Sequence, residues 1–543
     1  MKYSIILLLL CYVNCFSQDT LTQKDIKHAS KLIDISYTDK EIEMMYPDLK
    51  DNLGEYKKLH QLTLNNSVGM SLIQVISPLP TTKQKEIKWV FNKSIKRPSN
   101  INDIAFYSIN QLGSLLRNKS ITAIELTKFF IQRLRKFDDS LHCVVSLTEE
   151  LAMQQAKQAD ELFSKGIDKG PLQGIPYGLK DLFAVKGTKT TWGAEPYKNQ
   201  TIEEEAFVYT KLKEAGAVLV AKFTLGALAM GDYWFGGRTR NPWNLEEGSS
   251  GSSAGSTSAT VAGLIPFAIG TETHGSIISP SHTCGATGLR PTFGSVSRSG
   301  AMALSWSLDK IGPICRSAED AATVFAFIHG SDGQDGSAVN EAFNYTPTKD
   351  VKQLRIGYAK NYFDKLDSSS QEWNVLKQLK KLGIKLVGMN FPDTEVYQYD
   401  MIGIVIGSEA AAAFDEFTRT DLDDQMTKQE RYDWPNYFRT ARTIPAVEYI
   451  NTNRHRALLM KKINDAMKNF DIIITPTFEG KQLSITNLTG HPALCMPIGL
   501  DKQQLPNSIT MLANLYKEED LLLFGKFFQD HTNYDDMHPS MFK

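Results

Sequence analysis

The chain has 543 residues, of which 42% are hydrophobic, 22% charged and 10% aromatic. This composition is that of a globular protein and excludes collagen, a coiled coil or disorder as the main architecture. The formal net charge is −1, from 60 lysines and arginines against 61 aspartates and glutamates. No overall positive charge therefore attracts the chain to nucleic acid or to an anionic membrane surface.

Residues 1–17 have the features of a secretory signal peptide. One lysine precedes the apolar run from Ile5 to Val13, and Cys15 and Ser17 place small residues at the −3 and −1 positions before Gln18. The run is far shorter than the roughly 20 residues that a spanning helix needs. We therefore expect a periplasmic or secreted protein with no stable membrane span. A lipoprotein is less favoured, because the residues before the two cysteines of this segment are not small.

Residues 18–103 are charged and are predicted to form an accessory helical segment. Thr38 and Glu41 have the spacing of a capping box, in which each side chain bonds to a backbone N–H at the start of a helix. Two roles stay open for this segment, namely packing onto the main domain or pairing with another copy of the chain in a homodimer.

Residues 104–543 are predicted to form an α/β domain. Capping-box spacings at Thr122 and Glu125, and at Ser146 and Glu149, predict two helices. Short apolar runs alternate with helical segments further on, which indicates a largely parallel or mixed sheet. These expected strands are Gly174 to Leu179, Ala217 to Ala221, Ile265 to Ile269, Leu354 to Tyr358, and Ile472 to Ile474.

Four cysteines lie outside the signal segment, and they are widely spaced without a CxxC pair. This spacing favours neither a disulfide framework nor a zinc site. We expect buried free thiols at Cys143, Cys284, Cys315 and Cys495.

Lys180 is a candidate general base. It stands at the end of an expected strand, where alternation places its side chain on the face opposite that of Asp181. Burial disfavours the ammonium form and lowers the pKa of a lysine from its usual value of about 10.4. A neutral amine can then accept a proton.

The stretch from Gly248 to Ser258 is rich in serine and glycine. Composition alone leaves two interpretations open, a flexible linker and a buried, tightly turned segment. A third interpretation is the nucleophile elbow of α/β-hydrolases, because Gly251 to Gly255 match G-x-S-x-G with Ser253 as nucleophile. The polar residues before it do not predict the strand that an elbow needs, so the elbow is disfavoured.

A second serine-containing segment, GTETHGSIISPS, offers a candidate nucleophile, Ser276. The backbone N–H groups of Thr273, His274, Gly275 and Ser276 are suited to hold a developing oxyanion if they point into one concavity.

The motifs taken in order resemble the amidase signature family from about residue 104 to the C-terminus. They are GIPYGLKD, GSSAGSTSATVAG, GTETHGSIISPSHTCGATGLRPTFG, SLDKIGPICRSAEDA, DIIITPT and NLTGHPALCMPIG. Ser252 and Ser276 stand 24 residues apart, a spacing similar to that between the two catalytic serines of the family.

The resemblance implies an α/β/α sandwich and a Ser–cis-Ser–Lys triad. Ser276 would be the nucleophile and Ser252, with a cis peptide from Gly251, the bridging serine. Lys180 would accept the proton through Ser252 during formation of an acyl-enzyme. The family's oxyanion hole would map to residues 273–276, and Ser253 would hydrogen-bond within the site. Lys222 has no serine partner in this mapping, and neither a metal nor an organic cofactor is implied.

Two departures from the family pattern bear on the substrate. Glu272-Thr273-His274 stands where many members read Asp-x-Gly, which leaves the backbone donors in place and adds a ring beside the nucleophile. Ile278 and Ser279 occupy positions where many members carry an arginine. This absence favours a neutral or extended substrate over a small diacid amide.

The expected function is hydrolysis of a linear carboxamide, from a small molecule or a peptide, to an acid and ammonia or an amine. The alternatives are the component of a glutamyl-tRNA amidotransferase that shares this fold and triad, and a catalytically silent protein of the same fold. The family's pocket walls come from a variable stretch, here about 390–455, and from the N-terminal segment. Aromatic residues in the variable stretch are candidates either for the pocket or for the core: Tyr397, Tyr399, Trp434, Tyr437 and Phe438.

Overall fold

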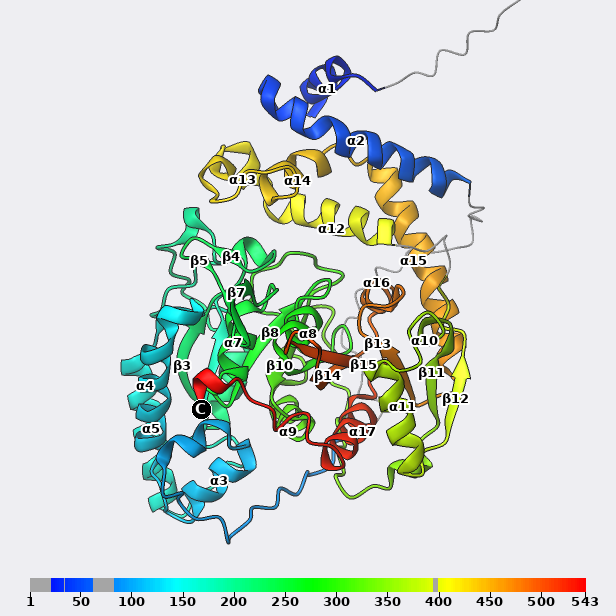
Figure 1. The fold of residues 1–543 in the computed structure, drawn as a ribbon. Coiled ribbons are helices and arrows are strands. Elements are labelled where there is room, and N and C mark those ends of the chain that lie inside the picture. The colour runs from blue at the N-terminus through cyan, green and yellow to red at the C-terminus, as the bar shows by residue number, and fades with distance from the viewer. Residues whose placement is uncertain (1–20, 34, 62–82, 394–398) are drawn as a thin grey trace, which may run out of the picture.

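A computed structural model describes residues 21–33, 35–61, 83–393 and 399–543. The predicted signal peptide, 1–17, lies outside these residues. The core is one mixed sheet of 11 strands (Figure 1). In sheet order the strands are β1 (Val144–Leu147), β3 (Val218–Phe223), β2 (Pro176–Lys180), β8 (Phe267–Glu272), β10 (Lys310–Cys315), β9 (Thr287–Arg290), β14 (Ala493–Leu500), β15 (Pro506–Ala513), β13 (Ile472–Pro476), β11 (Ile356–Ala359) and β12 (Leu386–Met389).

The sheet is parallel in two places and antiparallel elsewhere. β2 runs parallel to both β3 and β8, and β11 runs parallel to both β12 and β13. These two parallel groups include every strand expected from the apolar runs, namely β2, β3, β8, β11 and β13. All six side chains of β3 are buried, which explains why the run from Val218 to Ala221 is continuously apolar rather than alternating.

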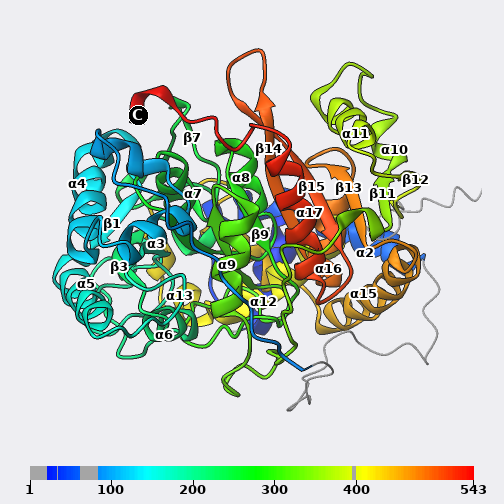
Figure 2. The same cartoon turned by 90° about the horizontal axis from the view of Figure 1, so that it is seen from below.

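Helices cover both faces of the sheet (Figure 2). The α/β/α sandwich with a large mixed sheet is therefore confirmed. The helices are α1 (Gln23–Ser30), α2 (Asp39–His60), α3 (Ile109–Arg117), α4 (Ala123–Leu141), α5 (Glu149–Ser164), α6 (Phe207–Glu214), α7 (Ala254–Val261), α8 (Ile278–Cys284), α9 (Ala318–Ile328), α10 (Lys360–Phe363), α11 (Gln371–Lys381), α12 (Tyr399–Ala413), α13 (Asp415–Arg419), α14 (Trp434–Ala441), α15 (Ala446–Met467), α16 (Gln482–Thr489) and α17 (Glu518–Asp530).

Two of the three expected capping boxes form. Thr38 caps α2 and Thr122 caps α4, each with the reciprocal bond from the glutamate three residues on. The third was wrong, because Ser146 belongs to β1 and the residue before α5 is Thr148, whose side chain makes no capping bond. Pairing of β1 with β3 overrides the local capping signal at this point.

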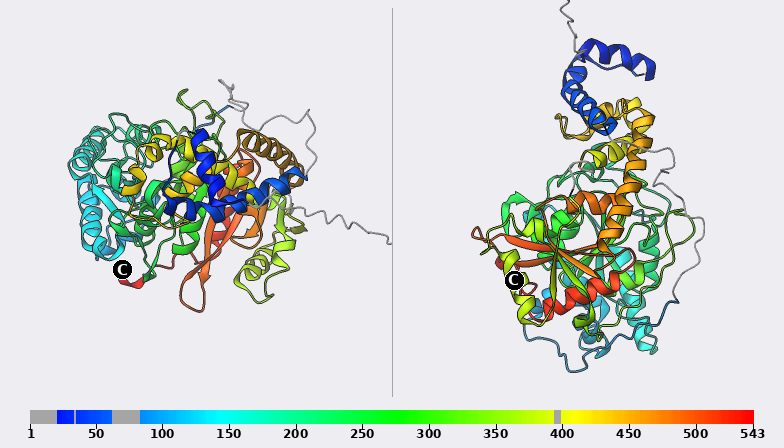
Figure 3. Two further views of the ribbon diagram at one scale, coloured as in Figure 1. Left: turned by 90° about the horizontal axis from the view of Figure 1, so that it is seen from above. Right: turned by 90° about the vertical axis from the view of Figure 1, so that its right-hand side faces the viewer.

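The N-terminal helices α1 and α2 lie over α12, α13 and α14, away from the sheet (Figures 1 and 3). They enclose a small apolar cluster of their own that includes Ile26, Ile42 and Met45. Charged contacts fasten α2 to the residues of α14 and the turn before it: Arg431 lies 2.5 Å from Asp48. The accessory segment thus packs onto the main domain of the same chain.

Two further features complete the fold. Short ribbons β4–β5 (Tyr233–Trp234 and Gly237–Arg238) and β6–β7 (Arg240–Asn241 and Asn244–Gly248) precede the Ser/Gly segment. The four cysteines expected to be free are free and buried. Within the described ranges, no helix has both the length and the apolar character of a membrane-crossing segment.

Candidate active site

The Ser/Gly segment is a buried turn between β7 and α7, so the linker interpretation was wrong. The peptide bond between Gly251 and Ser252 is cis. A β-carbon on Gly251 would lie 1.9 Å from the carbonyl oxygen of Gly231, so only glycine allows this approach of the two backbones. Ser252 and Ser253 are both buried directly after it.

Lys180 ends β2 and points at this turn. Its Nζ lies 2.8 Å from Ser252 Oγ, 2.8 Å from Thr271 Oγ1 and 3.3 Å from Ser253 Oγ. The side chain is fully buried. Burial lowers the pKa of Lys180 to about 7, although the negative charges of Asp309 and Glu272 oppose the shift. A large fraction of the amine is therefore neutral near pH 7 and able to accept a proton.

Asp181 faces the other side of β2, as strand alternation predicted. Its carboxylate lies 2.9 Å from Lys222 Nζ and accepts hydrogen bonds from the backbone and side chain of Thr191. Lys222 thus pairs with an aspartate instead of a serine. Because Asp181 is engaged in this buried ion pair, the groups that bond to Lys180 Nζ in the described chain are hydroxyls.

Ser276 follows β8 in a tight loop. Gly275 before it has φ +83°, a left-handed conformation in which a β-carbon would also crowd Ser279 Oγ at 2.9 Å. The carbonyl oxygen of Ser276 accepts the backbone N–H of Ser253 at 3.1 Å, which joins the two serine segments. In the described part of the chain, the backbone N–H groups of Gly275 and Ser276 donate to no acceptor. Ser276 is 8% exposed.

Glu272 orders this loop, a role that local sequence patterns do not reveal. Its carboxylate accepts the backbone N–H groups of Ile277 and Ile278, each at 2.9 Å. It also accepts from Arg290 at 3.0 Å and Asn487 at 2.8 Å. Burial alone would raise the pKa of Glu272, but Arg290 and other nearby donors lower it to about 2. In the sequence this glutamate stands out only as a departure from the family motif.

The side chains of Thr273 and His274 are both hydrogen-bonded to residues outside the loop. Thr273 Oγ1 donates to Asp309 at 2.6 Å, and His274 Nε2 lies 3.0 Å from Ser484 Oγ on α16. Burial lowers the pKa of His274 to about 4, so the ring is neutral at pH 7. These contacts anchor the part of the loop that precedes Ser276.

Ser253 is hydrogen-bonded on all sides. Its Oγ donates to the carbonyl oxygen of Thr271 at 3.1 Å and accepts the N–H of the same residue at 3.1 Å. The expectation that no strand precedes this segment was wrong, because β7 ends at Gly248. However, β7 belongs to a two-stranded ribbon outside the main sheet, whereas an elbow follows a strand of the central sheet.

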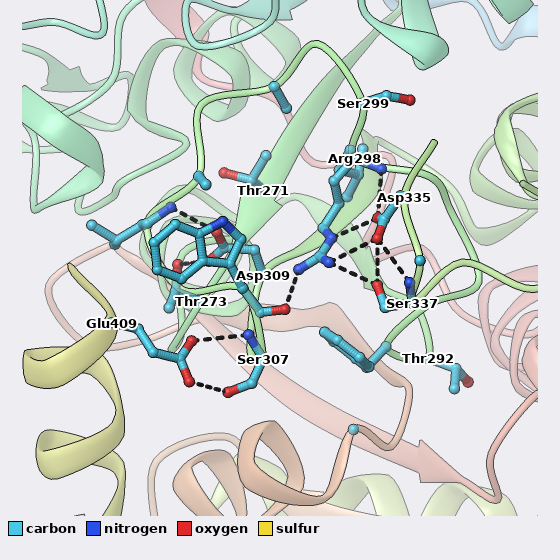
Figure 4. A pocket seen from close by; sticks show the side chains of 18 of the residues that line it. Thr271, Thr273, Thr292, Arg298, Ser299, Ser307, Asp309, Asp335, Ser337 and Glu409 are labelled. Carbon is cyan, nitrogen blue, oxygen red and sulfur yellow. Dashed lines mark hydrogen bonds and ion pairs between the residues drawn. The ribbon is translucent and has the colours of Figure 1, made fainter. Parts of the chain in front are cut away.

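A cavity of about 700 Å³ begins at Thr271 and Thr273 and extends outward (Figure 4). Much of its wall is formed by residues 298–304, 306, 307 and 309 and by residues 334–337. From the variable stretch, Glu409 and Tyr449 line it. None of the described residues of the N-terminal segment does.

The aromatic candidates for the pocket belong elsewhere. Trp434 and Phe438 are buried and stack on each other at a ring-centroid distance of 4.8 Å, and the hydroxyl of Tyr437 donates to Gly403. Tyr397 and the side chain of Tyr399 lie outside what the structure describes. No cluster of three or more His, Cys, Asp or Glu side chains suited to a metal ion occurs among the described residues.

Comparison with known proteins identifies the class to which this fold and site belong. A family model described as Amidase matches residues 125–522. The chain therefore belongs to the amidase signature family.

Its relatives within this family include enzymes of different kinds. The chain is 32% identical over 481 residues to the A component of "Glutamyl-tRNA(Gln) amidotransferase" from Coxiella burnetii, covering 80% of this chain and 99% of that protein. A solved structure of native peptide amidase from Stenotrophomonas maltophilia has a TM-score of 0.72 and 25% identity, covering 80% of this chain and 98% of that one. A bacterial aryl acylamidase has the same fold, with a TM-score of 0.72 at 20% identity, over 81% of this chain and 99% of that one.

Proposed function

We propose that the chain is a serine amidase that hydrolyses a linear carboxamide to a carboxylic acid and ammonia or an amine. The observation that carries this proposal is the buried Lys180 amine, 2.8 Å from Ser252 Oγ, with its pKa lowered to about 7. A lysine in this state suits proton transfer at neutral pH better than a charged surface lysine.

In the proposed reaction, Ser276 Oγ attacks the amide carbonyl. The proton of Ser276 passes to Ser252 Oγ, and the proton of Ser252 passes to Lys180 Nζ. The backbone N–H groups of Gly275 and Ser276 stabilise the negative oxygen that develops, together with the donors of Thr273 and His274 in the same loop.

Collapse of this intermediate breaks the C–N bond. Lys180 returns its proton through Ser252 to the leaving nitrogen, which departs as ammonia or an amine and leaves an acyl group on Ser276. A water molecule then attacks the ester and gives its proton to the same relay, and the relay returns a proton to Ser276 Oγ as the acid is released.

Covalent labelling tests the assignment directly. A fluorophosphonate probe followed by peptide mapping should label Ser276, and Ser276→Ala should abolish both labelling and ammonia release. Lys180→Ala should remove most of the activity. Labelling of Ser253, with activity retained in Ser276→Ala, would support the nucleophile elbow. Absence of labelling in the folded protein would support a catalytically silent binding protein.

The second candidate function is that of a glutamyl-tRNA amidotransferase component. The 32% identity to the Coxiella burnetii protein over 80% of this chain favours it. The predicted signal peptide opposes it, because charging of tRNA is cytoplasmic, and we propose instead that residues 1–17 are removed on export to the periplasm or beyond. Fractionation with N-terminal sequencing decides: a periplasmic protein beginning at Gln18 supports the amidase, and an intact cytoplasmic N-terminus supports the amidotransferase.

A further inference from the structure

The cavity beside Thr271 and Thr273 is lined by charged side chains that already have partners. Arg298 donates to Asp335 through Nε at 2.7 Å and through Nη2 at 2.9 Å (Figure 4). It also donates to Ser337 Oγ at 2.7 Å and to the carbonyl oxygen of Trp306 at 2.6 Å. Because its guanidinium is paired with both oxygens of one carboxylate, Arg298 is a poor ionic partner for a charged ligand.

The second charged group of the wall is compensated as well. Glu409 accepts the backbone N–H and hydroxyl of Ser307 at 2.9 and 2.6 Å, and the hydroxyl of Tyr449 at 2.8 Å. Arg456 donates to Ser307 from the other side at 2.9 and 2.8 Å, so Ser307 bridges an acid and a base. The pair leaves this end of the cavity without a net charge.

Asp309 completes the set. Its Oδ2 accepts the backbone N–H groups of Leu304 and Ser305 at 2.8 and 2.9 Å, and its Oδ1 accepts Thr273 Oγ1. These three donors hold the carboxylate in place, and none of them carries a charge. An anionic ligand entering the cavity would lose its hydration without gaining an ionic partner, because Arg298 and Arg456 are already engaged, which disfavours it relative to a neutral one.

Trp306 projects from the turn that these contacts fix. Its indole side chain lines the cavity and is 49% exposed. On both sides of Trp306 the backbone is hydrogen-bonded: Leu304 and Ser305 donate their N–H groups to Asp309, and Ser307 donates its N–H group to Glu409. The carbonyl oxygen of Trp306 itself accepts a hydrogen bond from Arg298. An exposed aromatic surface on an immobilised turn binds a flat ligand at low entropic cost.

We propose that Trp306 is the platform of a substrate subsite that takes an uncharged aromatic group of the amide. The cavity that Trp306 lines also reaches Thr271, which bonds to Lys180, and Thr273 of the Ser276 loop, so an aromatic group on Trp306 lies in the same space as these two neighbours of the proposed catalytic groups. Apolar side chains such as Phe293, Met302 and Ile311 complete the lining. This proposal rests on the proposed amidase function and adds to it a substrate class.

Two pairs of amides test the subsite and show which side of the scissile bond it holds. Phenylpropionamide against propionamide varies the acyl side, and acetanilide against N-methylacetamide varies the amine side. The subsite holds only one side of the scissile bond, so only one of the two pairs should respond. In that pair, the wild-type enzyme should favour the aromatic member by about tenfold or more in kcat/KM. Trp306→Ala should reduce this preference at least fivefold, and Trp306→Phe should keep most of it.

Phe478→Ala is the matched control, because Phe478 is equally exposed, at 50%, and does not line the cavity. It should leave the preference unchanged. Succinamate, which carries a negative charge where phenylpropionamide carries its ring, should be a poorer substrate than the aromatic amide. An unchanged preference in Trp306→Ala, or a preferred charged amide, would overturn the proposal.

A binding measurement separates failure of the subsite from failure of the proposed function. Phenylpropionamide and acetanilide are titrated into Ser276→Ala protein by calorimetry, with and without Trp306→Ala. Binding of either that weakens at least fivefold without the indole supports the subsite, even if the wild-type enzyme proves inactive. Hydrolysis without an aromatic preference refutes the subsite alone, and neither hydrolysis nor binding refutes both.

Discussion

The indole N–H of Trp434 donates to the carbonyl oxygen of Leu228 at 3.0 Å, which ties α14 to the loop beside the candidate active site. Leu228 and Ala229 have backbone φ angles of 49° and 64°, left-handed values that residues other than glycine rarely adopt. Ala229 lines the cavity, and the carbonyl oxygen of Gly231 packs against Gly251. The contact therefore supports a bent loop that borders both the cavity and the Ser252 turn.

Trp434→Phe should weaken this support while keeping the stacked ring. We expect the free energy of unfolding to fall by about 1–2 kcal/mol, because the carbonyl oxygens of Ala227 and Leu228 lose a buried donor. Labelling of Ser276 by the fluorophosphonate should also slow. Trp373→Phe removes an equivalent indole bond to Phe363 far from the site and should leave the labelling rate unchanged. Equal labelling rates in both variants would contradict the supporting role.

Local sequence patterns were sufficient to predict β2, β3, β8, β11 and β13 of the 11-stranded sheet, and the placement of Lys180. A strand with an apolar run is buried on both faces whatever its neighbours are, and alternation alone separates Lys180 from Asp181. Local patterns, however, do not pair Lys180 with Ser252, which only the family resemblance brings together. They are 72 residues apart, and no local period reports a contact across that separation.

Long-range partners explain what the sequence could not predict. Glu272 meets Asn487 across 215 residues, so its function in ordering the Ser276 loop depends on how β8 and α16 pack. Trp434 and Phe438 have the spacing of one helix face, which indicates burial but not whether the face meets the core or a cavity. In the fold, that face packs against Phe414 and Phe417.

Asp309→Asn should move the acid limb of the activity profile to lower pH. The carboxylate of Asp309 stabilises the protonated form of Lys180, so its removal should lower the pKa of Lys180 further. An asparagine can still accept the N–H groups of Leu304 and Ser305 and pair with Thr273. We expect a displacement of up to about one pH unit in the profile of kcat/KM. Asp364→Asn, at an exposed ion pair with Lys360, is the control and should show none; a displacement to higher pH would contradict the assignment.

Lys180→Met should remove most of the activity and also the unfavourable free energy of burying a charged amine. The pKa of Lys180 is about 7 in the folded chain and 10.5 when exposed, so the unfolded chain binds more protons between these values. Stability contributed by this group therefore rises with pH across that window. Each pKa unit corresponds to about 1.4 kcal/mol.

Urea denaturation of both proteins at pH 6.5 and 9.5 checks this prediction. The wild-type protein should gain a few kcal/mol more than Lys180→Met between the two pH values. Comparing the two proteins cancels the contribution of the other titrating groups. An equal pH dependence would mean that Lys180 is charged in the folded protein, which would also remove it as the general base.

Glu272→Gln should damage both the fold and the reaction. The amide oxygen can still accept the N–H groups of Ile277 and Ile278, but the buried Arg290 loses its one carboxylate partner among the described residues. Breaking one side of a buried ion pair costs about 3–5 kcal/mol. We expect that loss in urea denaturation and slower labelling of Ser276. Glu272→Asp keeps the charge and should recover part of both; if Glu272→Gln labels at the wild-type rate, Glu272 does not position Ser276.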